Sequence, residues 1–452
     1  MSNRTVRNYC LPVVLLMTIS LLLVSSSLFA QSGFDPRSMG MGGPGVAVAN
    51  PATAPFFNPA VLSIEERERF AIDGPIIGVR AYDPNNFRNE LNSFQNLNLV
   101  DGLQTSISNF NLAPSEASST AVVASINELN DSLGALGGSP VQANLGIGLT
   151  LGDTGQKFGW AIYTAGNGAF GTIFNYRDGA FLGGFADAID QVNFDNPASN
   201  TTAQLDALAD FITYDVDPNT GEITNVQVVD FSEDNIESTV DVMGLGWMEV
   251  GMSLSTHLGD FACGVTPKFV RARIFDYSAS ALSADVGDFD VTDYQTDYEN
   301  FNIDIGFARE TADGWIIGMV GKNLIEQQYK GYRRDPVTQV IEPTGNVITI
   351  SPTIQVGAAR QEDWGTVAVD FDLQETEGFN GLPGSQYLST GVELDPWGWG
   401  QVRAGYRANL SDSERSVLSA GIGISPFGIH VDLAVAGNKN ELGAAAQFGF
   451  RF

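Results

Sequence analysis

The chain ends in two segments that alternate strictly: IHVDLAVAG at residues 429–437 and LGAAAQFGFRF at residues 442–452. In the first segment Ile429, Val431 and their odd-numbered successors are apolar, whereas His430 and Asp432 lie between them. Successive side chains of a β-strand point to opposite faces of the sheet. Each segment therefore predicts a strand with one apolar face and one face of polar or very small residues.

The same alternation recurs along the chain in segments of about ten residues, which is the length that a tilted strand needs to cross a bilayer. We place strands near residues 70–82, 141–151, 157–177, 238–258, 261–277, 301–308, 315–325, 346–360, 364–374, 386–395, 401–410, 417–425, 429–437 and 442–452. No segment after the N-terminal region reaches the roughly 18 consecutive apolar residues of a transmembrane helix. A helical membrane protein is therefore excluded.

The connections between these strands take turns being short and long. Even-numbered strands lead into tight turns such as 152–155 and 259–260, whereas odd-numbered strands lead into longer loops, above all 83–140 and 178–237. Short turns on one side, long loops on the other and an even number of strands are typical of outer-membrane barrels. The predicted fold is all-β: a transmembrane antiparallel β-barrel of about fourteen strands at residues 64–452, in the outer membrane of a Gram-negative bacterium. A soluble, secreted all-β protein is the alternative.

Composition narrows the function classes. The chain has 452 residues, with 53 acidic side chains against 23 basic ones and a formal net charge of −30. Binding of nucleic-acid phosphates needs clustered Lys and Arg, so a direct nucleic-acid surface is not expected.

The N-terminal region predicts two segments that are not part of the barrel wall. Arg4 and Arg7 precede a short apolar run, and small residues follow it up to Ala30. This order is typical of a secretory signal peptide at residues 1–30. Residues 31–63 are rich in Gly, Ala and Pro and do not alternate. Because a barrel of fourteen strands is too wide to be filled by its own wall side chains, we expect this segment to be a plug in the lumen.

The two longest loops carry helical periodicity. Apolar residues keep helical spacing at Phe87, Leu91, Phe94 and Leu97, at Val122, Ile126, Leu129, Leu133 and Leu136, and more weakly at Leu205, Leu208 and Ile212. One interpretation is that these helices cap the barrel mouth and pack on each other. The other is that their apolar faces form a landing groove for a hydrophobic ligand.

Two stretches at the N-terminal end carry a family resemblance. RSMGMGG at residues 37–43 and FNPAVL at residues 57–62 resemble the N-terminal hatch of FadL-type outer-membrane barrels. The C-terminal third, including AGIGISPFGIH at 420–430, is similar to the conjugal transfer TraF-like barrel family. The resemblance implies a 14-stranded barrel with an internal hatch, and its FadL side implies passage of hydrophobic compounds. The hatch residues expected from it are Gly40, Gly42, Gly43, Asn58, Pro59 and Ala60.

The last strand ends in Phe452, with Phe448 and Phe450 at alternate positions before it. This pattern resembles the C-terminal signal that the barrel-assembly machinery reads. Ordinary alternation of lipid-facing aromatic residues is the simpler interpretation.

Candidates for chemistry are few. His430 with Asp432, and Ser255 with His257, are pairs of the kind that membrane-barrel hydrolases use, but polar residues of a wet lumen explain both more simply. The motifs of hydrolases, metalloproteases and phosphate loops are absent from the sequence. We therefore expect no catalytic residue, no cofactor and no metal ligand. Acidic residues of the loop at 278–300 are expected to be solvated, or else bridged by divalent cations to lipopolysaccharide headgroups.

Two functional hypotheses follow. The first is passage of a small hydrophobic compound across the outer membrane. The second is a barrel that serves conjugation or envelope assembly through protein partners, without a transported substrate.

Overall fold

The structure is a computed structural model that describes residues 34–48, 50, 52–64, 70–87, 94, 97–138, 140–155, 157–231, 236–280, 294–334, 340–376, 378 and 384–451. The expected signal peptide at residues 1–30 and Phe452 lie outside the described residues.

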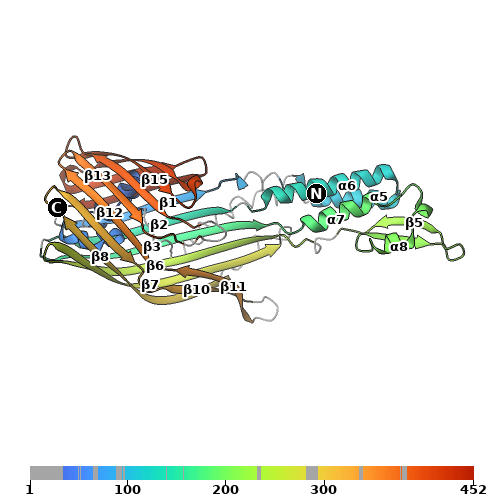
Figure 1. Cartoon of the computed structure of the whole chain (residues 1–452), viewed down its shortest axis with the longest axis horizontal. Coiled ribbons are helices and arrows are strands. Elements are labelled where there is room, and N and C mark those ends of the chain that lie inside the picture. The colour runs from blue at the N-terminus through green and yellow to red at the C-terminus, as the bar shows by residue number, and fades with distance from the viewer. Residues whose placement is uncertain are drawn as a thin grey trace, which may run out of the picture.

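Tight turns and long loops bring consecutive strands side by side, and the described strands close into one antiparallel barrel of fourteen (Figure 1). Its strands are β1 (Phe70–Tyr82), β2 (Val141–Asp153), β3 (Gly159–Asn175), β6 (Thr239–Leu258), β7 (Phe261–Ser280), β8 (Gln295–Glu310), β9 (Trp315–Lys322), β12 (Thr353–Glu362), β13 (Gly365–Asp372), β14 (Tyr387–Leu394), β15 (Gly400–Asn409), β16 (Val417–Ile424), β17 (Ile429–Gly437) and β18 (Glu441–Arg451). Pairing of β1 with β18 closes the barrel.

Each strand expected from the sequence overlaps one strand of this barrel, so the fold prediction is confirmed. One boundary is wrong: residues 346–360 were expected to form a single strand, but they contain the end of β11 (Ile341–Ile350) and the start of β12. β11 pairs with β10 (Gln327–Arg334) in a separate hairpin. Alternation continues across the break between them, and the sequence pattern therefore joins two strands that belong to different sheets.

The apolar face of the strands points away from the barrel axis. On β17 the side chains of Ile429, Val431, Leu433 and Val435 are 40–55% exposed, whereas His430 and Asp432 are buried. Exposed aromatic side chains gather at the tight-turn end, including Phe158, Trp364, Trp397, Trp399 and Phe427. Such rings are typical of the interface between hydrocarbon and headgroups. The barrel thus has the lipid-facing belt and the aromatic girdle of an outer-membrane barrel.

The wall is much taller on one side than on the other. β6 and β7 each span 20 residues, whereas β9 and β13 each span 8. The β10–β11 hairpin packs on the inward-facing residues of the tall side, where Tyr329 lies 6.2 Å from the Trp247 ring and 5.2 Å from the Tyr298 ring, centroid to centroid. An apolar cluster therefore covers the inner face of the wall near the loop end.

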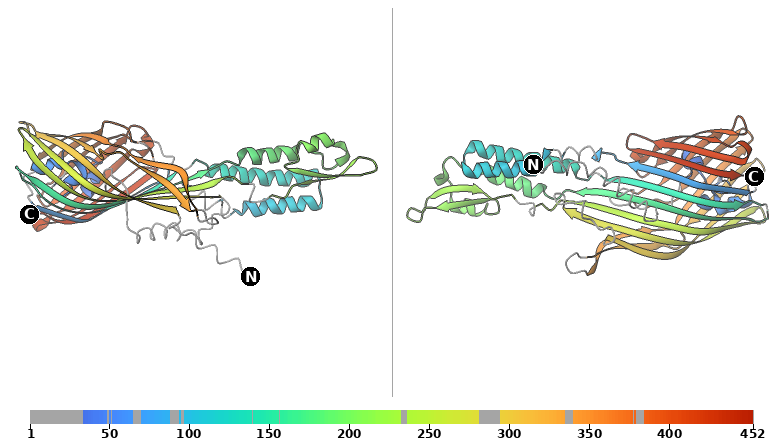
Figure 2. Two further views of the ribbon diagram at one scale, coloured as in Figure 1. Left: turned by 90° about the horizontal axis from the view of Figure 1, so that it is seen from below. Right: turned by 180° about the vertical axis from the view of Figure 1, so that it is seen from behind.

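The two longest loops fold together into an arm beyond the barrel (Figures 1 and 2). Its elements are α5 (Leu99–Leu112), α6 (Glu116–Leu136), α7 (Gly179–Asp190), η3 (Pro197–Ser199), α8 (Thr202–Asp206), β4 (Ile212–Val216) and β5 (Ile223–Val228). α6 begins after Ser115, whose side chain accepts a hydrogen bond from the Ser118 backbone N–H. No helix of the described residues is long and apolar enough to span a membrane.

The packing of the helices within the arm distinguishes the two interpretations of the loop helices. Val122, Ile126, Leu129, Leu133 and Leu136 are at most 1% exposed, in a core shared with α5 and α7. The helices therefore pack on each other and leave no apolar landing groove on this face. They also extend away from the barrel mouth, where a cap was expected (Figure 2).

One predicted detail of the loops is wrong. The weak stripe at residues 205–212 is not one helix, because α8 ends at Asp206 and Ile212 belongs to β4. Of the expected stripe at residues 87–97, Phe87, Phe94 and Leu97 are described and helical, whereas Leu91 lies outside the described residues. Most of the acidic stretch, residues 281–293, lies outside the described residues, while Asp297 is on β8 and pairs with Arg273.

If the outward-facing apolar residues form a lipid belt, the loss of stability caused by a charged substitution should depend on its depth in the bilayer. Leu433→Arg places a guanidinium at the middle of β17 on the outward face, which should lower the free energy of unfolding in vesicles by about 2–4 kcal/mol. Leu410→Arg, at the loop-side rim just beyond β15, is the control and should cost about 0–1 kcal/mol. Denaturant unfolding of the refolded barrel measures both. Equal costs at the two positions would contradict a hydrocarbon belt.

Candidate functional site

Residues 34–64, called the lumenal segment below, form a short, folded stretch whose turns are capped by their own side chains. α2 (Pro36–Gly40) follows Asp35, whose carboxylate accepts a hydrogen bond of 2.7 Å from the Ser38 backbone N–H. α3 (Ala54–Phe57) leads to Asn58, whose side-chain oxygen accepts from the Ala60 backbone N–H and so starts η2 (Pro59–Ser63). Each of the three turns has proline at its first or second position, where the nitrogen needs no hydrogen-bond partner.

The segment follows the inner wall of the barrel from strand to strand. α2 packs against β16, β17 and β18, and η2 packs against β6, β7 and β8. Between them, the Asp370 carboxylate of β13 accepts hydrogen bonds of 2.7 and 2.8 Å from the backbone N–H groups of Gly45 and Val46. Asn58 donates to the Phe307 carbonyl of β8, and Ser255 of β6 donates to the Ala60 carbonyl. Strands on opposite sides of the barrel are thus bonded to one short piece of chain.

Inward-facing glycines make room for the segment. A β-carbon at any of eight wall positions would come within 2.6 Å of an atom of the segment; these are Gly78, Gly146, Gly159, Gly264, Gly306, Gly318, Gly391 and Gly405. Gly391 and Gly405 face Met41, and Gly306 faces the Asn58 side chain. Within the segment, Gly42 has a φ of +85° and fits against the backbone of β15, where a larger residue would be both strained and crowded. Small residues on the polar face of the strands therefore have a packing role.

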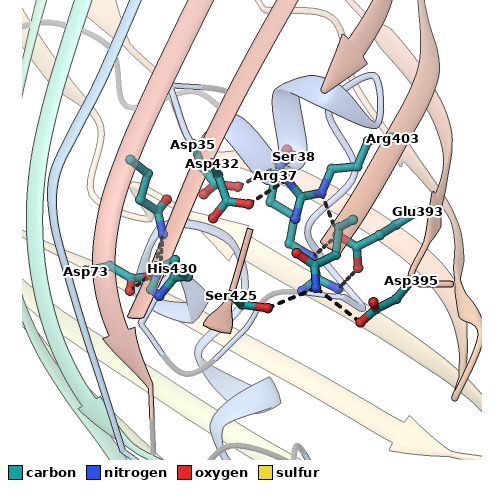
Figure 3. Close-up of polar contacts among 12 residues, drawn as sticks. Asp35, Arg37, Ser38, Asp73, Glu393, Asp395, Arg403, Ser425, His430 and Asp432 are labelled. Carbon is teal, nitrogen blue, oxygen red and sulfur yellow. Dashed lines mark hydrogen bonds and ion pairs between the residues drawn. The ribbon is translucent and has the colours of Figure 1, made fainter. Parts of the chain in front are cut away.

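A chain of buried charges joins α2 to the wall (Figure 3). Arg37 donates two hydrogen bonds to Glu393, of 2.7 and 3.0 Å, and a third to the Val48 carbonyl. Arg403 bridges Glu393 and Asp432, at 2.5 and 2.6 Å. Two guanidinium groups are therefore balanced by two carboxylates, which is what burial of charge requires.

The residue pairs considered for catalysis are not brought together. His430 Nε2 lies 2.8 Å from Asp73 Oδ1 of β1, and Asp432 binds Arg403 (Figure 3). The hydroxyl of Ser255 contacts Ser63, while His257 is exposed at the end of β6. Among the described residues no group of three His, Cys, Asp or Glu side chains could hold a metal ion.

The predicted hatch residues all lie in this segment, but the side chains that hold it were not identified from the sequence. Glu393, Arg403 and Asp370 occupy inward positions of strands whose alternation was recognised. The sequence signal that could have identified them is a charged residue at a lumen-facing position of a strand, between apolar neighbours. The alternation of apolar and polar residues does not show which charged side chains meet across the lumen.

Among solved structures the chain is similar to the TodX ΔS2S3 mutant monoaromatic hydrocarbon channel, at 10% identity and a TM-score of 0.49 over 94% of this chain and 100% of that one. It is also similar to the Ralstonia pickettii toluene transporter TbuX (12%, 0.49, 94% and 100%) and to a Pseudomonas aeruginosa FadL homologue (12%, 0.44, 95% and 99%). No curated protein sequence matches it.

A family model matches residues 55–372, which begin within the lumenal segment and run through β13. The chain therefore belongs to the family described as the F plasmid transfer operon TraF protein.

Proposed function

We propose that this barrel passes a small hydrophobic compound across the outer membrane of a Gram-negative bacterium, and that residues 31–63 act as its hatch. No catalytic step is part of the proposal. Its main support is an aromatic patch of the lumenal segment that lies against an interrupted stretch of the wall.

The interruption is in β1. Its register shifts between Asp73 and Ile76 against both neighbours, β2 and β18. Pro75 lies within this stretch and has no N–H to donate to a neighbouring strand. The hydrogen-bond ladder is therefore interrupted here on both sides of the same strand.

On the lumenal side of this part of β1, the lumenal segment places aromatic side chains. Phe34 lies against the inward-facing Gly78, Gly146 and Gly148, and its ring centroid is 5.3 Å from that of Phe56. Phe56 in turn lies 5.2 Å from the Tyr163 ring of β3. Outside the apolar cluster around Trp247, much of the inner wall is polar and charged, so this patch is a place where an apolar solute could be held at low cost.

The segment suits the role of a hatch because polar contacts hold it. It is fixed by hydrogen bonds and by the Arg37–Glu393 ion pair, and glycines line much of the wall beside it. Such contacts can be exchanged for contacts with water when the segment moves, whereas a large apolar core could not be opened at so low a cost.

Uptake tests the transported class. A strain without the gene should take up at least one small hydrophobic solute more slowly, because the outer leaflet resists entry of apolar compounds. The measurement is initial uptake of a panel of radiolabelled aromatic and aliphatic solutes, with re-expression of the intact chain as the control. Unchanged uptake across the panel would reject transport of hydrophobic compounds.

Release of the hatch can be measured without a substrate. Glu393→Gln removes the carboxylate shared by Arg37 and Arg403, so a cysteine placed at the buried Ala47, in a Cys263→Ser background, should react with a maleimide several-fold faster. Glu310→Gln, an exposed carboxylate at the end of β8, is the control and should leave the rate unchanged. Equal rates in all three proteins would mean that the ion pair does not fasten the segment.

The arm supports a second candidate, a barrel that acts through conjugation or envelope partners. It carries its own apolar core outside the barrel, and the family description refers to plasmid transfer. Deletion of residues 99–136 together with 179–228 should then lower plasmid transfer or abolish copurification of envelope proteins, with the barrel still assembled. Normal transfer and copurification would leave transport as the surviving proposal.

The C-terminal signal remains a proposal as well. Phe448 and Phe450 lie on β18, 5.1 Å apart between ring centroids, and Phe448 is exposed on the outward face. These positions are consistent with recognition by the barrel-assembly machinery before they face lipid.

A further inference from the structure

Buried charges of the inner wall form small clusters, and most of these clusters are matched. Each basic side chain in them has at least one carboxylate of its own; the clusters are Arg37 and Arg403 with Glu393 and Asp432, Lys268 with Glu249 and Asp304, and Arg451 with Asp73. Matching is expected, because a buried charge without a partner is costly.

One cluster near the loop-side end of the wall departs from this rule. Arg80 of β1 and Arg407 of β15 both contact the same oxygen of Glu441, at 3.1 and 3.2 Å. Arg415, in η6 (Ser413–Arg415), lies over the ring of Tyr82, which is two residues after Arg80 on the same face of β1. Three guanidinium groups therefore gather on this part of the wall, and two of them share one carboxylate.

The remaining contacts of these arginines are with neutral groups. Arg415 donates to the Gln142 side chain at 3.1 Å and lies 5.1 Å above the Tyr82 ring. Arg407 lies 4.5 Å from the centre of the Tyr387 ring. Aromatic faces and amides orient a guanidinium, but they do not neutralise it.

Donor atoms in the cluster lack acceptors. The Nε atoms of Arg407 and Arg415 and the Nδ2 atom of Asn409 are buried and have no hydrogen-bond partner among the described residues. The three residues are 4%, 9% and 3% exposed. Buried donors are almost always satisfied in folded proteins, so unsatisfied donors on a doubly positive cluster indicate a missing acceptor of negative charge.

Neighbouring carboxylates are already engaged elsewhere. Asp372 accepts from the Gln355 side chain and the Tyr387 backbone N–H. Asp412 accepts from the Glu414 backbone N–H, and the Glu414 carboxylate binds Lys439. None of these contacts supplies the acceptor that the arginines lack.

We propose that Arg80, Arg407 and Arg415 form a binding site for a small oxyanion, a carboxylate or phosphate group that enters the lumen from the loop side. Guanidinium groups bind such groups through paired, charge-assisted hydrogen bonds. The side chains are on the inward face of the wall, out of reach of lipid headgroups, so the ligand is a soluble anion. Gly43 of the lumenal segment lies beside Ser389 and the Arg407 side chain, which places the site next to the turn of the hatch.

Direct binding tests the site without any transport assay. The mature chain, refolded in detergent free of lipopolysaccharide, is titrated calorimetrically at constant ionic strength with sodium benzoate, sodium phosphate and the neutral benzyl alcohol. At least one of the two anions should bind saturably and more tightly than benzyl alcohol. Arg415→Gln should weaken that binding by about tenfold, the value of one charge-assisted hydrogen bond.

A second variant is expected to change anion binding in the opposite direction. Glu441→Gln removes the one carboxylate of the described residues that contacts both Arg80 and Arg407, so it should tighten anion binding several-fold. Arg309→Gln, an exposed arginine paired with Asp260 at the tight-turn end, is the matched control and should bind like the unmodified chain. Circular dichroism verifies that each protein is folded. Absence of saturable binding by both anions in the folded unmodified chain, or an equal loss in Arg309→Gln, would overturn the site.

Discussion

Lipid cannot hydrogen-bond to a peptide group, and this constraint governs the whole molecule. Every N–H and C=O within the membrane must find its partner in the sheet, so the sheet has to close, as it does where β1 meets β18. Closure fixes which side chains face lipid and which face the lumen. The apolar residues of β17 face outward, and His430 and Asp432 of the same strand are thereby placed inside, where only other protein groups or water can satisfy them.

Two kinds of residue in the lumen accommodate these inward-facing groups. Charged side chains such as Glu393 and Arg403 pair across strands, and glycines such as Gly391 let the backbone of residues 34–64 approach the wall. The segment supplies partners of its own, for example Arg37. Its contacts reach from β16–β18 on one side to β6–β8 on the other, so that a piece of chain outside the sheet ties together strands far apart in the sequence.

Much of the fold could be predicted because lipid exposure imposes a strict period of two. Each strand of the barrel, the tight turns and the helical stripe at residues 122–136 followed from spacing. The β10–β11 hairpin did not, because its alternation continues into β12 and gives no sign that it folds onto Trp247 and Tyr298. The segment at the start of the chain was recognised, but not Asp370, Glu393 or Arg403 that hold it, because contacts across a lumen depend on register and barrel width. The arginine cluster at Arg80, Arg407 and Arg415 was missed for the same reason, since its members are far apart in the chain.

The claim on which the account depends is that the exposed apolar side chains form a closed belt in the outer membrane. Cell fractionation followed by gel electrophoresis of heated and unheated samples tests it in one experiment. The account predicts that the mature chain sediments with outer membranes, needs detergent for extraction and migrates faster before heating than after, because the closed barrel stays compact in mild detergent. A chain that stays in the periplasm, dissolves without detergent and shows no change in mobility on heating would contradict it.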